Sequence, residues 1–318
     1  MALSVTEANA VQSKYFDKTM IQIAYEASPF WKMLVNRYKK KYPGGTAWTF
    51  PVRYKQLGRF RSISPREQLV FGSVQTRTQG EITPAYYEVD TLINWDERLQ
   101  NKDEPKIVDL LRDRSSELMQ DFHEGMATDV WTQSTAAYPL TAVPTMVGAS
   151  DTYANIAAAD IANGNWASVI DTTTTKVKIY GSGSISEAIN LATFGDREPT
   201  DIFTTRQLYT KVEELAAARQ QTTMADEGVR NLGVPNFKYL DKRFIKEPFM
   251  PTGDMYGLNM NEISLKVHPD ADPYVSEWTD LMVAGRPQAM AKVLMWSGQL
   301  FTKTRDTHFK FTALVYTQ

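Results

Sequence analysis

The stretch from Pro105 to Trp131, PKIVDLLRDRSSELMQDFHEGMATDVW, places the strongest constraint on the fold of this chain. Its apolar residues recur at steps of four and seven, which places them on one stripe of an α-helix. They are Ile107, Leu111, Leu118, Phe122, Met126 and Val130. Asp103 and Glu104 put negative charge at the expected N-terminus, and Pro105 suits the first turn. Such a helix is roughly 40 Å long, and its apolar stripe needs a partner surface.

The residues before this helix predict β-structure. AWTFPVRY (47–54) and PAYYEVDTLI (84–93) are rich in aromatic and β-branched residues, and a polar sequence with scattered glycines separates them. We expect a long, two-stranded β-excursion over residues 43–92. Because an isolated hairpin is marginally stable in water, this excursion needs another surface to lie on.

The N-terminal residues predict helices. Residues 6–28 have helical spacing until Ser28-Pro29, and a second amphipathic piece, FWKMLVNRYKKKY, ends at Tyr42. The pattern leaves open whether residues 1–42 form an arm or pack on their own domain.

Charge is distributed unevenly between neighbouring segments. From Arg37 to Arg77 there are ten basic residues and one acid, whereas Glu81 to Asp129 contains thirteen acids and five bases. One interpretation is that the basic excursion reaches an acidic helix, its own or that of an identical neighbour. Each exposed pair contributes only about 0 to 1 kcal/mol, so the pattern governs register more than affinity. The alternative is nucleic-acid binding by residues 48–77, where basic and aromatic residues alternate.

The remainder of the chain mixes helices and strands without regular alternation, which predicts the α+β class. ISEAINLATF and QLYTKVEELAAARQ are expected helices, and PTDIFTTRQ is an expected buried strand. Three strands are expected near the C-terminus, with turns at Ser297-Gly298 and at 305–307.

No catalytic pattern is present in the sequence. There is no cysteine, and the three histidines, His123, His268 and His308, lie far apart in patterns that indicate packing or surface residues. The GSGS at 181–184 lacks the continuation of a phosphate-binding loop. We therefore predict no enzyme, no metal and no cofactor. No secretion signal and no run of 18 apolar residues occurs, so neither export nor a membrane span is expected.

Taken in order, these parts resemble the major capsid proteins of tailed phages with the Hong Kong 97-type fold. Three local stretches are also similar to that family. They are TEANAVQSKYFDKTM…YEASPFWKMLV, EPTDIFTTRQLYTKVEELA and DMYGLNMNEISLKV. The resemblance implies five regions: an N-arm (1–42), an extended β-hairpin called the E-loop (43–92), a peripheral domain (93–140) with the spine helix (105–131), an α/β axial domain (141–285), and C-terminal strands that complete the peripheral domain (286–318).

The same resemblance implies self-assembly into hexamers and pentamers of an icosahedral shell that encloses double-stranded DNA. It implies a place in the virion, assembly in the bacterial cytoplasm, a portal protein, and DNA packaged without sequence-specific binding. The chain starts directly at the arm, which suggests a separate scaffolding protein. An encapsulin-like compartment around a protein cargo uses the same architecture and stays open as an alternative.

In such shells the E-loop lies on a neighbour's peripheral domain, so the two charged segments are expected to meet between chains. The basic side is predicted to be Arg53, Lys55, Arg59, Arg61 and Arg66. The acidic side is predicted to be Asp109, Asp113, Glu117, Asp121 and Glu124. Some relatives crosslink an E-loop lysine to an asparagine. Lys55 is present, but no partner asparagine is identified, so no crosslink is predicted.

Overall fold

The structure is a computed structural model. It describes residues 28–42, 44–53, 57–58, 60–68, 71–94, 96–97, 104–158, 166–217, 238–239, 241–281 and 289–316. The side chains of residues 104–109, 216–217 and 238–239 are not among those described. The helix expected over residues 6–28 lies almost wholly outside this part of the chain.

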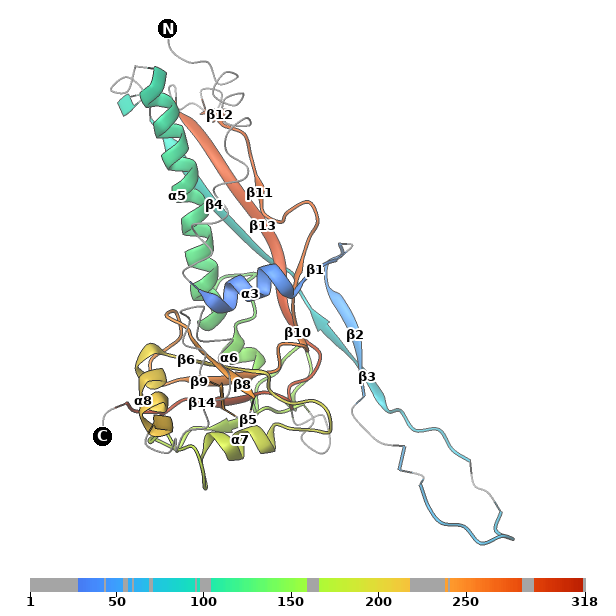
Figure 1. Cartoon of the computed structure of the whole chain (residues 1–318). Helices are drawn as coiled ribbons and strands as arrows, with labels where there is room; N and C mark the ends of the chain where they lie inside the picture. Colours follow the sequence, from blue (N-terminus) through green and yellow to red (C-terminus); the bar gives the residue numbers. More distant parts are fainter. Residues whose placement is uncertain are drawn as a thin grey trace.

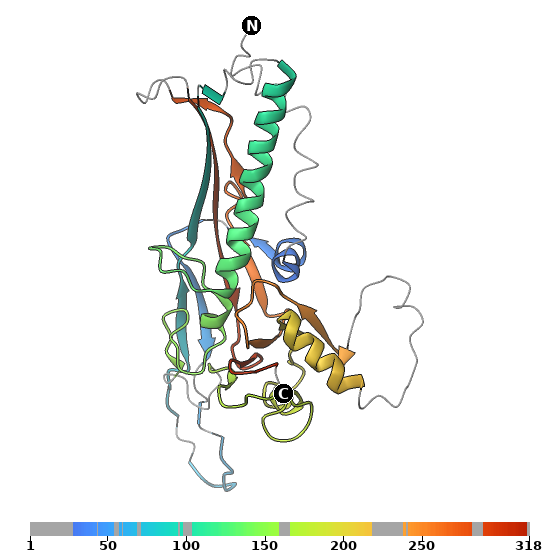
Figure 2. The same cartoon turned by 90° about the vertical axis from the view of Figure 1, so that its left-hand side faces the viewer.

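The predicted long helix is present as α5 (Glu104–Trp131), 28 residues in length. Figures 1 and 2 show it running along one face of a sheet. Its stripe is buried from Leu118 to Val130, and Phe122 lies 6.3 Å from Trp296 of the sheet, measured between ring centroids. The described part of the apolar stripe is therefore a core face, as the periodicity predicted, and Ile107 lies outside the described side chains.

The sheet beside α5, called here the peripheral sheet, has six strands built around one long central strand. They are β1 (Lys39–Lys41), β4 (Ala85–Ile93), β10 (Ile263–Val267), β11 (Tyr274–Val275), β12 (Thr279–Asp280) and β13 (Met290–Thr302). β13 pairs antiparallel with β4 over nine positions, from Met290 opposite Ile93 to Gly298 opposite Ala85. It also pairs antiparallel with β10, β11 and β12.

The projecting hairpin is built differently from the expected one. β2 (Trp48–Arg53) pairs antiparallel with β3 (Arg77–Ile82), a polar segment that the sequence did not mark as a strand. PAYYEVDTLI does form a strand, but this strand, β4, pairs with β13 in the peripheral sheet. The prediction that residues 84–93 return along 47–54 is therefore wrong. A strand with one face on α5 needs apolar residues, whereas in the hairpin strand β3 every second residue from Arg77 to Glu81 is exposed and polar.

The second six-stranded sheet, called here the axial sheet, has the order β5-β14-β9-β6-β8-β7. Its strands are β5 (Val169–Asp171), β6 (Asp201–Thr204), β7 (Lys238–Tyr239), β8 (Lys242–Lys246), β9 (Met255–Leu258) and β14 (Phe309–Phe311). Two helices accompany it, α7 (Ile185–Leu191) and α8 (Arg206–Ala217), whereas the short helix α6 (Val143–Met146) contacts α5 and belongs to the first core. α7 and α8 share a second core with this sheet, in which Ile189 and Leu208 are buried. The α+β class is confirmed.

Each of the two sheets contains strands from the sequence range that was predicted to form the other domain. β14 comes from the predicted C-terminal strands 286–318 but lies in the axial sheet, between β5 and β9. β10, β11 and β12 come from the predicted axial range 141–285 but pair with β13. The predicted division of the chain therefore differs from the sheet membership, because these pairings join segments that are far apart in sequence.

The N-terminal helix α3 (Pro29–Arg37) packs into the core of its own chain. Ser28 caps it by accepting from the Trp31 amide at 3.2 Å. Phe30 and Leu34 are fully buried, and the Trp31 indole donates to His123 Nδ1 on α5 at 2.9 Å. After α3, β1 pairs in parallel with β10. The described part of the predicted arm, from Ser28 onward, is thus a fixed part of the body.

The turn expected at Ser297-Gly298 is absent, because β13 continues through both residues. Gly298 serves close packing instead. A Cβ atom placed there would lie 2.6 Å from the Lys266 carbonyl oxygen of β10 and 2.6 Å from the Trp296 ring. The predicted turn after this strand, at 305–307, is present.

We expect Gly298→Ala to lower the free energy of unfolding by about 1 to 3 kcal/mol, because the backbone of β10 must move to admit the methyl group. Urea denaturation followed by tryptophan fluorescence measures this change. Gly125→Ala is the matched control. Gly125 lies inside α5 with open space at its Cβ, so alanine there should stabilise the helix by about 1 kcal/mol. Equal stability of wild type and Gly298→Ala would contradict the packing role.

Candidate functional site

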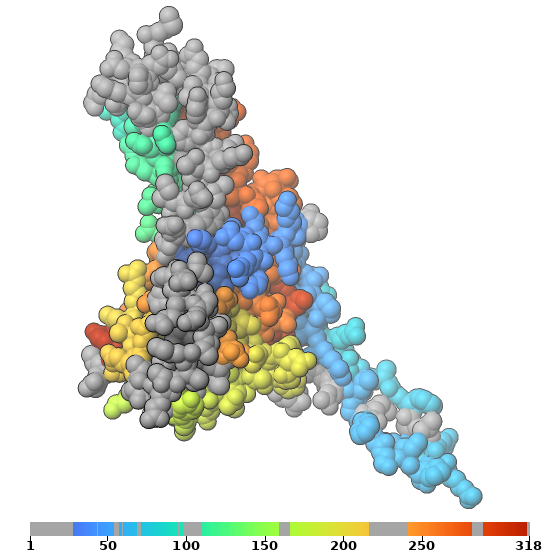
Figure 3. All heavy atoms as spheres, viewed as in Figure 1, coloured from blue at the N-terminus to red at the C-terminus, as the bar shows by residue number. Residues whose placement is uncertain are grey.

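The hairpin formed by β2, β3 and the residues between them projects away from the body of the molecule. Figure 1 and the space-filling view in Figure 3 both show it extending as a narrow finger. We call residues 57–71 the hairpin tip. Its exposed large apolar residues are Leu57, Phe60, Ile63 and Phe71. A surface of this kind is typical of a segment that packs on another molecule.

The predicted basic residues lie along this hairpin. Arg53 ends β2 opposite Arg77 of β3, and both are exposed. Arg61 forms an ion pair with Glu67 at 2.5 Å, and Arg66 is exposed at the turn of the tip. Lys55 and Arg59 lie outside the described residues.

The aromatic residues near the hairpin do not form a continuous stacking platform for bases. Trp48 is buried, and Phe50 packs edge-on against Phe301 at 4.9 Å between ring centroids. Tyr54 lies outside the described residues. The exposed aromatic residues among those described between 48 and 77 are Phe60 and Phe71, which are well separated in sequence. Single-strand binding by stacking needs several exposed rings in succession.

The predicted acidic residues form one exposed face of α5. Asp113, Glu117, Asp121 and Glu124 are all exposed, and we call them the acidic face of α5. Glu117 forms an ion pair with Arg114 at 3.1 Å. The side chain of Asp109 is outside the described set. α5 and the hairpin tip lie at opposite ends of the molecule in Figure 1, and no ion pair found among the described residues joins them. Contact between the two charged segments therefore requires a second chain.

The structure adds a second acidic face that the sequence analysis did not single out. In β4 and β13, Tyr87 and Trp296 point toward α5, since Tyr87 donates to Asp129 at 2.7 Å and Trp296 contacts Phe122. Neighbouring residues of a strand point to opposite faces. The opposite, exposed face therefore carries Tyr86, Glu88, Asp90 and Met295, and we call these residues the outer face of the peripheral sheet. The alternation in YYEVD carried this signal.

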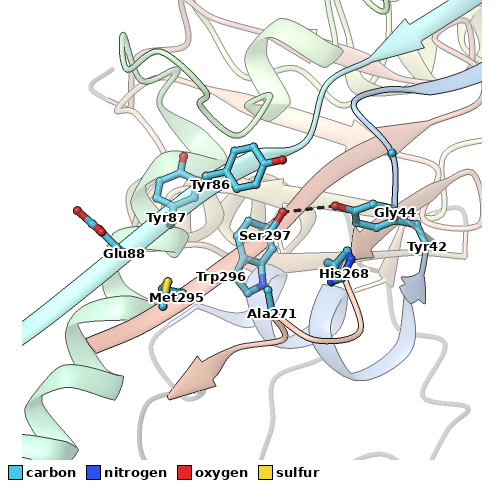
Figure 4. A pocket seen from close by; sticks show the side chains of 11 residues that line it. Tyr42, Gly44, Tyr86, Tyr87, Glu88, His268, Ala271, Met295, Trp296 and Ser297 are labelled. Carbon is cyan, nitrogen blue, oxygen red and sulfur yellow. Dashed lines mark hydrogen bonds between the residues drawn. The ribbon is translucent and has the colours of Figure 1, made fainter. Parts of the chain in front are cut away.

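A pocket of about 560 Å³ opens on this outer face, where the strands meet the base of the hairpin (Figure 4). Tyr42 and His268 form one wall, Tyr86 and Glu88 form the other, and Met295 and Ser297 lie between them. The Tyr42 hydroxyl lies 3.4 Å from the Ser297 hydroxyl. The lining is mainly aromatic and apolar with one carboxylate, which suits an apolar side chain flanked by positive charge.

Two of the three histidines, His123 and His308, are buried packing residues, whereas His268 lines the pocket. His123 Nδ1 accepts from Trp31, and burial lowers the pKa of its imidazole to about 4. His308 is fully buried and accepts from the Asn259 amide at 3.1 Å, and burial lowers its pKa to about 3. Among the described residues no cluster of three metal-ligating side chains occurs, and none of the described helices is long and apolar enough to cross a membrane.

One buried carboxyl group was not identified from the sequence. Glu247 follows β8 and is fully buried at the N-terminus of α3, where its Oε2 accepts from the Phe30 amide at 3.0 Å. Burial raises its pKa to about 7, although hydrogen bonds from Phe30, Ser28 and Phe249 act in the opposite direction. This carboxyl group ties the axial sheet to the first described helix and titrates near neutral pH.

Comparison with known proteins identifies the fold of this chain. No protein-family model and no curated protein matches the sequence. Among solved structures, the chain is similar to one in the cyanophage A-1(L) capsid asymmetric unit. The TM-score is 0.65 at 12% identity, over 91% of this chain and 93% of that chain. The chain has the Hong Kong 97-type capsid fold.

Two further structures support this fold assignment over the whole chain. A structure from Mycobacterium phage Adephagia matches with a TM-score of 0.56 at 12% identity, over 100% of both chains. The holo-SrpI encapsulin complex of Synechococcus elongatus PCC 7942 matches with a TM-score of 0.56 at 11% identity, over 100% of this chain and 98% of that chain. In the terms of the Hong Kong 97-type fold, α5 is the spine helix and the β2–β3 hairpin is the E-loop.

Proposed function

We propose that this chain is the major capsid protein of a tailed bacteriophage. It assembles into hexamers and pentamers of a closed icosahedral shell around double-stranded DNA, and it has no catalytic role. The observation that carries this proposal is the projecting hairpin with its exposed apolar tip, on a chain whose fold matches capsid structures along nearly its full length. In a single chain the hairpin tip leaves its apolar residues in water, whereas in a shell it can pack on a neighbouring subunit and join the two.

In this proposal the exposed arginines of the hairpin, Arg53, Arg61 and Arg66, bind acidic residues of a neighbouring subunit. Two acidic surfaces are available to receive them. One is the acidic face of α5, which the sequence predicts, and the other is the outer face of the peripheral sheet. The protein resides in the virion capsid and is assembled in the host cytoplasm, with a separate scaffolding protein and a portal protein as partners.

An encapsulin-like compartment is the second candidate, because the holo-SrpI encapsulin structure matches the whole chain as well as a phage structure does. The contents of the particle distinguish the two. Nuclease-protected DNA in particles from a phage lysate supports the capsid, whereas a co-purifying enzyme inside the particles supports the compartment.

Expression of the chain alone, followed by size-exclusion chromatography and negative-stain electron microscopy, tests whether it forms a shell. We expect megadalton particles or capsomers that close when a scaffolding protein is added. A monomer at all protein concentrations, with salt-sensitive binding to DNA, would instead support the nucleic-acid-binding interpretation.

A further inference from the structure

We propose that the loop over residues 145–156, held by the buried side chain of Arg305, sets the direction in which the β2–β3 hairpin projects from the body. We call residues 145–156 the bracing loop. Arg305 is a positioning residue, because it reaches the hairpin only through this loop. The inference concerns the fold of a single chain. Its consequence for a shell, that every subunit presents its hairpin at the same angle, rests on the proposed function.

The hairpin needs a brace because its two strands form a sheet of their own. Among the described strands, β2 and β3 pair with each other and with no strand of the two larger sheets. A two-stranded sheet is marginally stable in water. Trp48 is buried at the base of the hairpin, and Phe50 packs against Phe301. These apolar contacts bury the base, but they are non-directional and fix the angle of the hairpin only weakly.

Ala154 of the bracing loop supplies a directional contact. Its carbonyl oxygen accepts from the Glu81 amide of β3 at 2.9 Å. Among the described residues, this is the backbone hydrogen bond found between a hairpin strand and another part of the chain. Because Glu81 lies one residue before the end of β3, the bond holds the hairpin where it leaves the body (Figure 1).

The bond to the hairpin comes from a strained turn. Tyr153 and Ile156 exchange two backbone hydrogen bonds of 3.1 and 3.0 Å, and between them Ala154 and Asn155 have φ values of 55° and 59°. A left-handed backbone is unfavourable for alanine and persists only where the surroundings fix it. The Tyr153 hydroxyl accepts from the Thr302 amide of β13 at 3.0 Å, which attaches the turn to the peripheral sheet.

Arg305 holds the first half of the bracing loop. Its guanidinium group is fully buried and donates to three carbonyl oxygens of the loop, those of Met146 at 2.9 Å, Asp151 at 2.8 Å and Thr145 at 3.3 Å. Charge-assisted hydrogen bonds are stronger than neutral ones, and buried carbonyl groups left without a donor are costly. Gly148 leaves room for this group, since a Cβ atom there would lie 2.6 Å from Arg305 Nη2.

Spin labels can report the angle of the hairpin, because the chain contains no cysteine. We would label Arg77→Cys at the start of β3 together with Asp121→Cys on α5, both exposed positions. Double electron–electron resonance then measures the distances between the labels, at subunit concentrations below those that give particles. A second pair, Asp121→Cys with Asn190→Cys on α7, reports the body of the molecule and should stay unchanged in every variant.

Glu81→Pro removes the amide that binds Ala154. The Glu81 amide points away from β2, so proline leaves the pairing of β2 and β3 intact. We expect a broader distance distribution for the hairpin pair. Gln79→Pro is the matched control, because its amide points to the same edge and no backbone acceptor for it is found among the described residues. Glu81→Ala keeps the amide and controls for the lost carboxylate.

Arg305→Met removes the three donors, and we expect it to broaden the same distribution. Gly298→Ala controls for reduced stability, since Gly298 lies in β13 outside the bracing loop. If Arg305→Met does not fold, Gly148→Ala replaces it, because the added methyl group displaces the guanidinium group. An unchanged distribution in folded Arg305→Met or Gly148→Ala would overturn the role of Arg305.

An unchanged distribution in Glu81→Pro, or equal broadening in Gln79→Pro or Gly298→Ala, would overturn the bracing role of the loop. Negative-stain microscopy tests the consequence for assembly. We expect particles of mixed diameter from Glu81→Pro, and uniform particles of wild-type size would overturn that consequence while leaving the proposed shell intact. Wild-type protein that forms no particle would instead overturn the proposed function, and the spin-label distances would still decide the inference for the single chain.

Discussion

Replacing Arg53, Arg61 and Arg66 by glutamate is expected to abolish shell assembly and leave a folded subunit. The change reverses three exposed charges of the hairpin, of which Arg61 forms an ion pair with Glu67 of the same hairpin. In the proposed shell the new glutamates would face acidic residues of a neighbour on either candidate surface. Like-charge contacts at an interface cost several kcal/mol, and the cost recurs at every subunit of the shell.

The measurement is particle yield by size-exclusion chromatography and negative-stain microscopy, with circular dichroism as the test of folding. Arg53→Lys/Arg61→Lys/Arg66→Lys is the matched control, because it keeps the charge and loses only the geometry of the guanidinium group. We expect particles from the lysine variant at reduced yield. Normal shells from the glutamate variant would refute the role of these arginines.

The second large effect is a pH dependence of subunit stability that originates at Glu247. The pKa of this carboxyl group is raised by burial from its ordinary value of 4.5 to about 7. Well below pH 4.5 the Glu247 carboxyl group is protonated in both the folded and the unfolded chain. Its contribution to the free energy of unfolding is then at its maximum. As the pH rises from 4.5 to about 7, the unfolded chain gives up its proton first, so the free energy of unfolding falls by on the order of 3 kcal/mol.

Glu247→Gln removes this ionisation and keeps an oxygen that accepts from the Phe30 amide. We expect the variant to match wild type near pH 4.5 and to exceed it at pH 8 by up to about 3 kcal/mol. Urea unfolding at a series of pH values, at subunit concentrations below those that give particles, measures the difference. Because His123 and His308 have lowered pKa values and act in the opposite direction, only the difference between variant and wild type isolates Glu247.

Glu124→Gln is the control for this experiment, since Glu124 is an exposed glutamate on α5. Its stability difference from wild type should stay small at every pH. A difference between Glu247→Gln and wild type that does not change between pH 5 and 8 would contradict the assignment.

Local pattern was enough to predict several parts of this protein. The stripe of α5, the buried strand β6 and the helices α7 and α8 were all predicted from periodicity, because a helix or strand with one buried face repeats its apolar residues at a fixed step. The basic and acidic blocks are visible in composition alone. The order of these parts was also enough for the resemblance to the Hong Kong 97-type fold.

Pairing over long distances in sequence was decided only by the tertiary structure. The central pairing of β4 with β13 joins residues about 200 positions apart, and nothing in the local sequence of PAYYEVDTLI states which strand lies beside it. The position of β14 in the axial sheet and the burial of α3 against α5 also depend on contacts between residues that are far apart in sequence. A periodic pattern shows that a face must be buried, whereas its partner depends on which distant surface complements it.

The candidate site follows the same division. Sequence alone determined that a basic excursion and an acidic segment exist, that cysteine is absent, and that no catalytic pattern is present. The tertiary structure decided that the tip aromatics stay exposed, that Glu88 and Met295 share a face, and that a pocket forms between them and Tyr42. It also decided the burial that shifts the pKa of Glu247. Exposure, cavities and desolvation depend on atoms that the fold brings together from separate segments, and a linear sequence does not contain those distances.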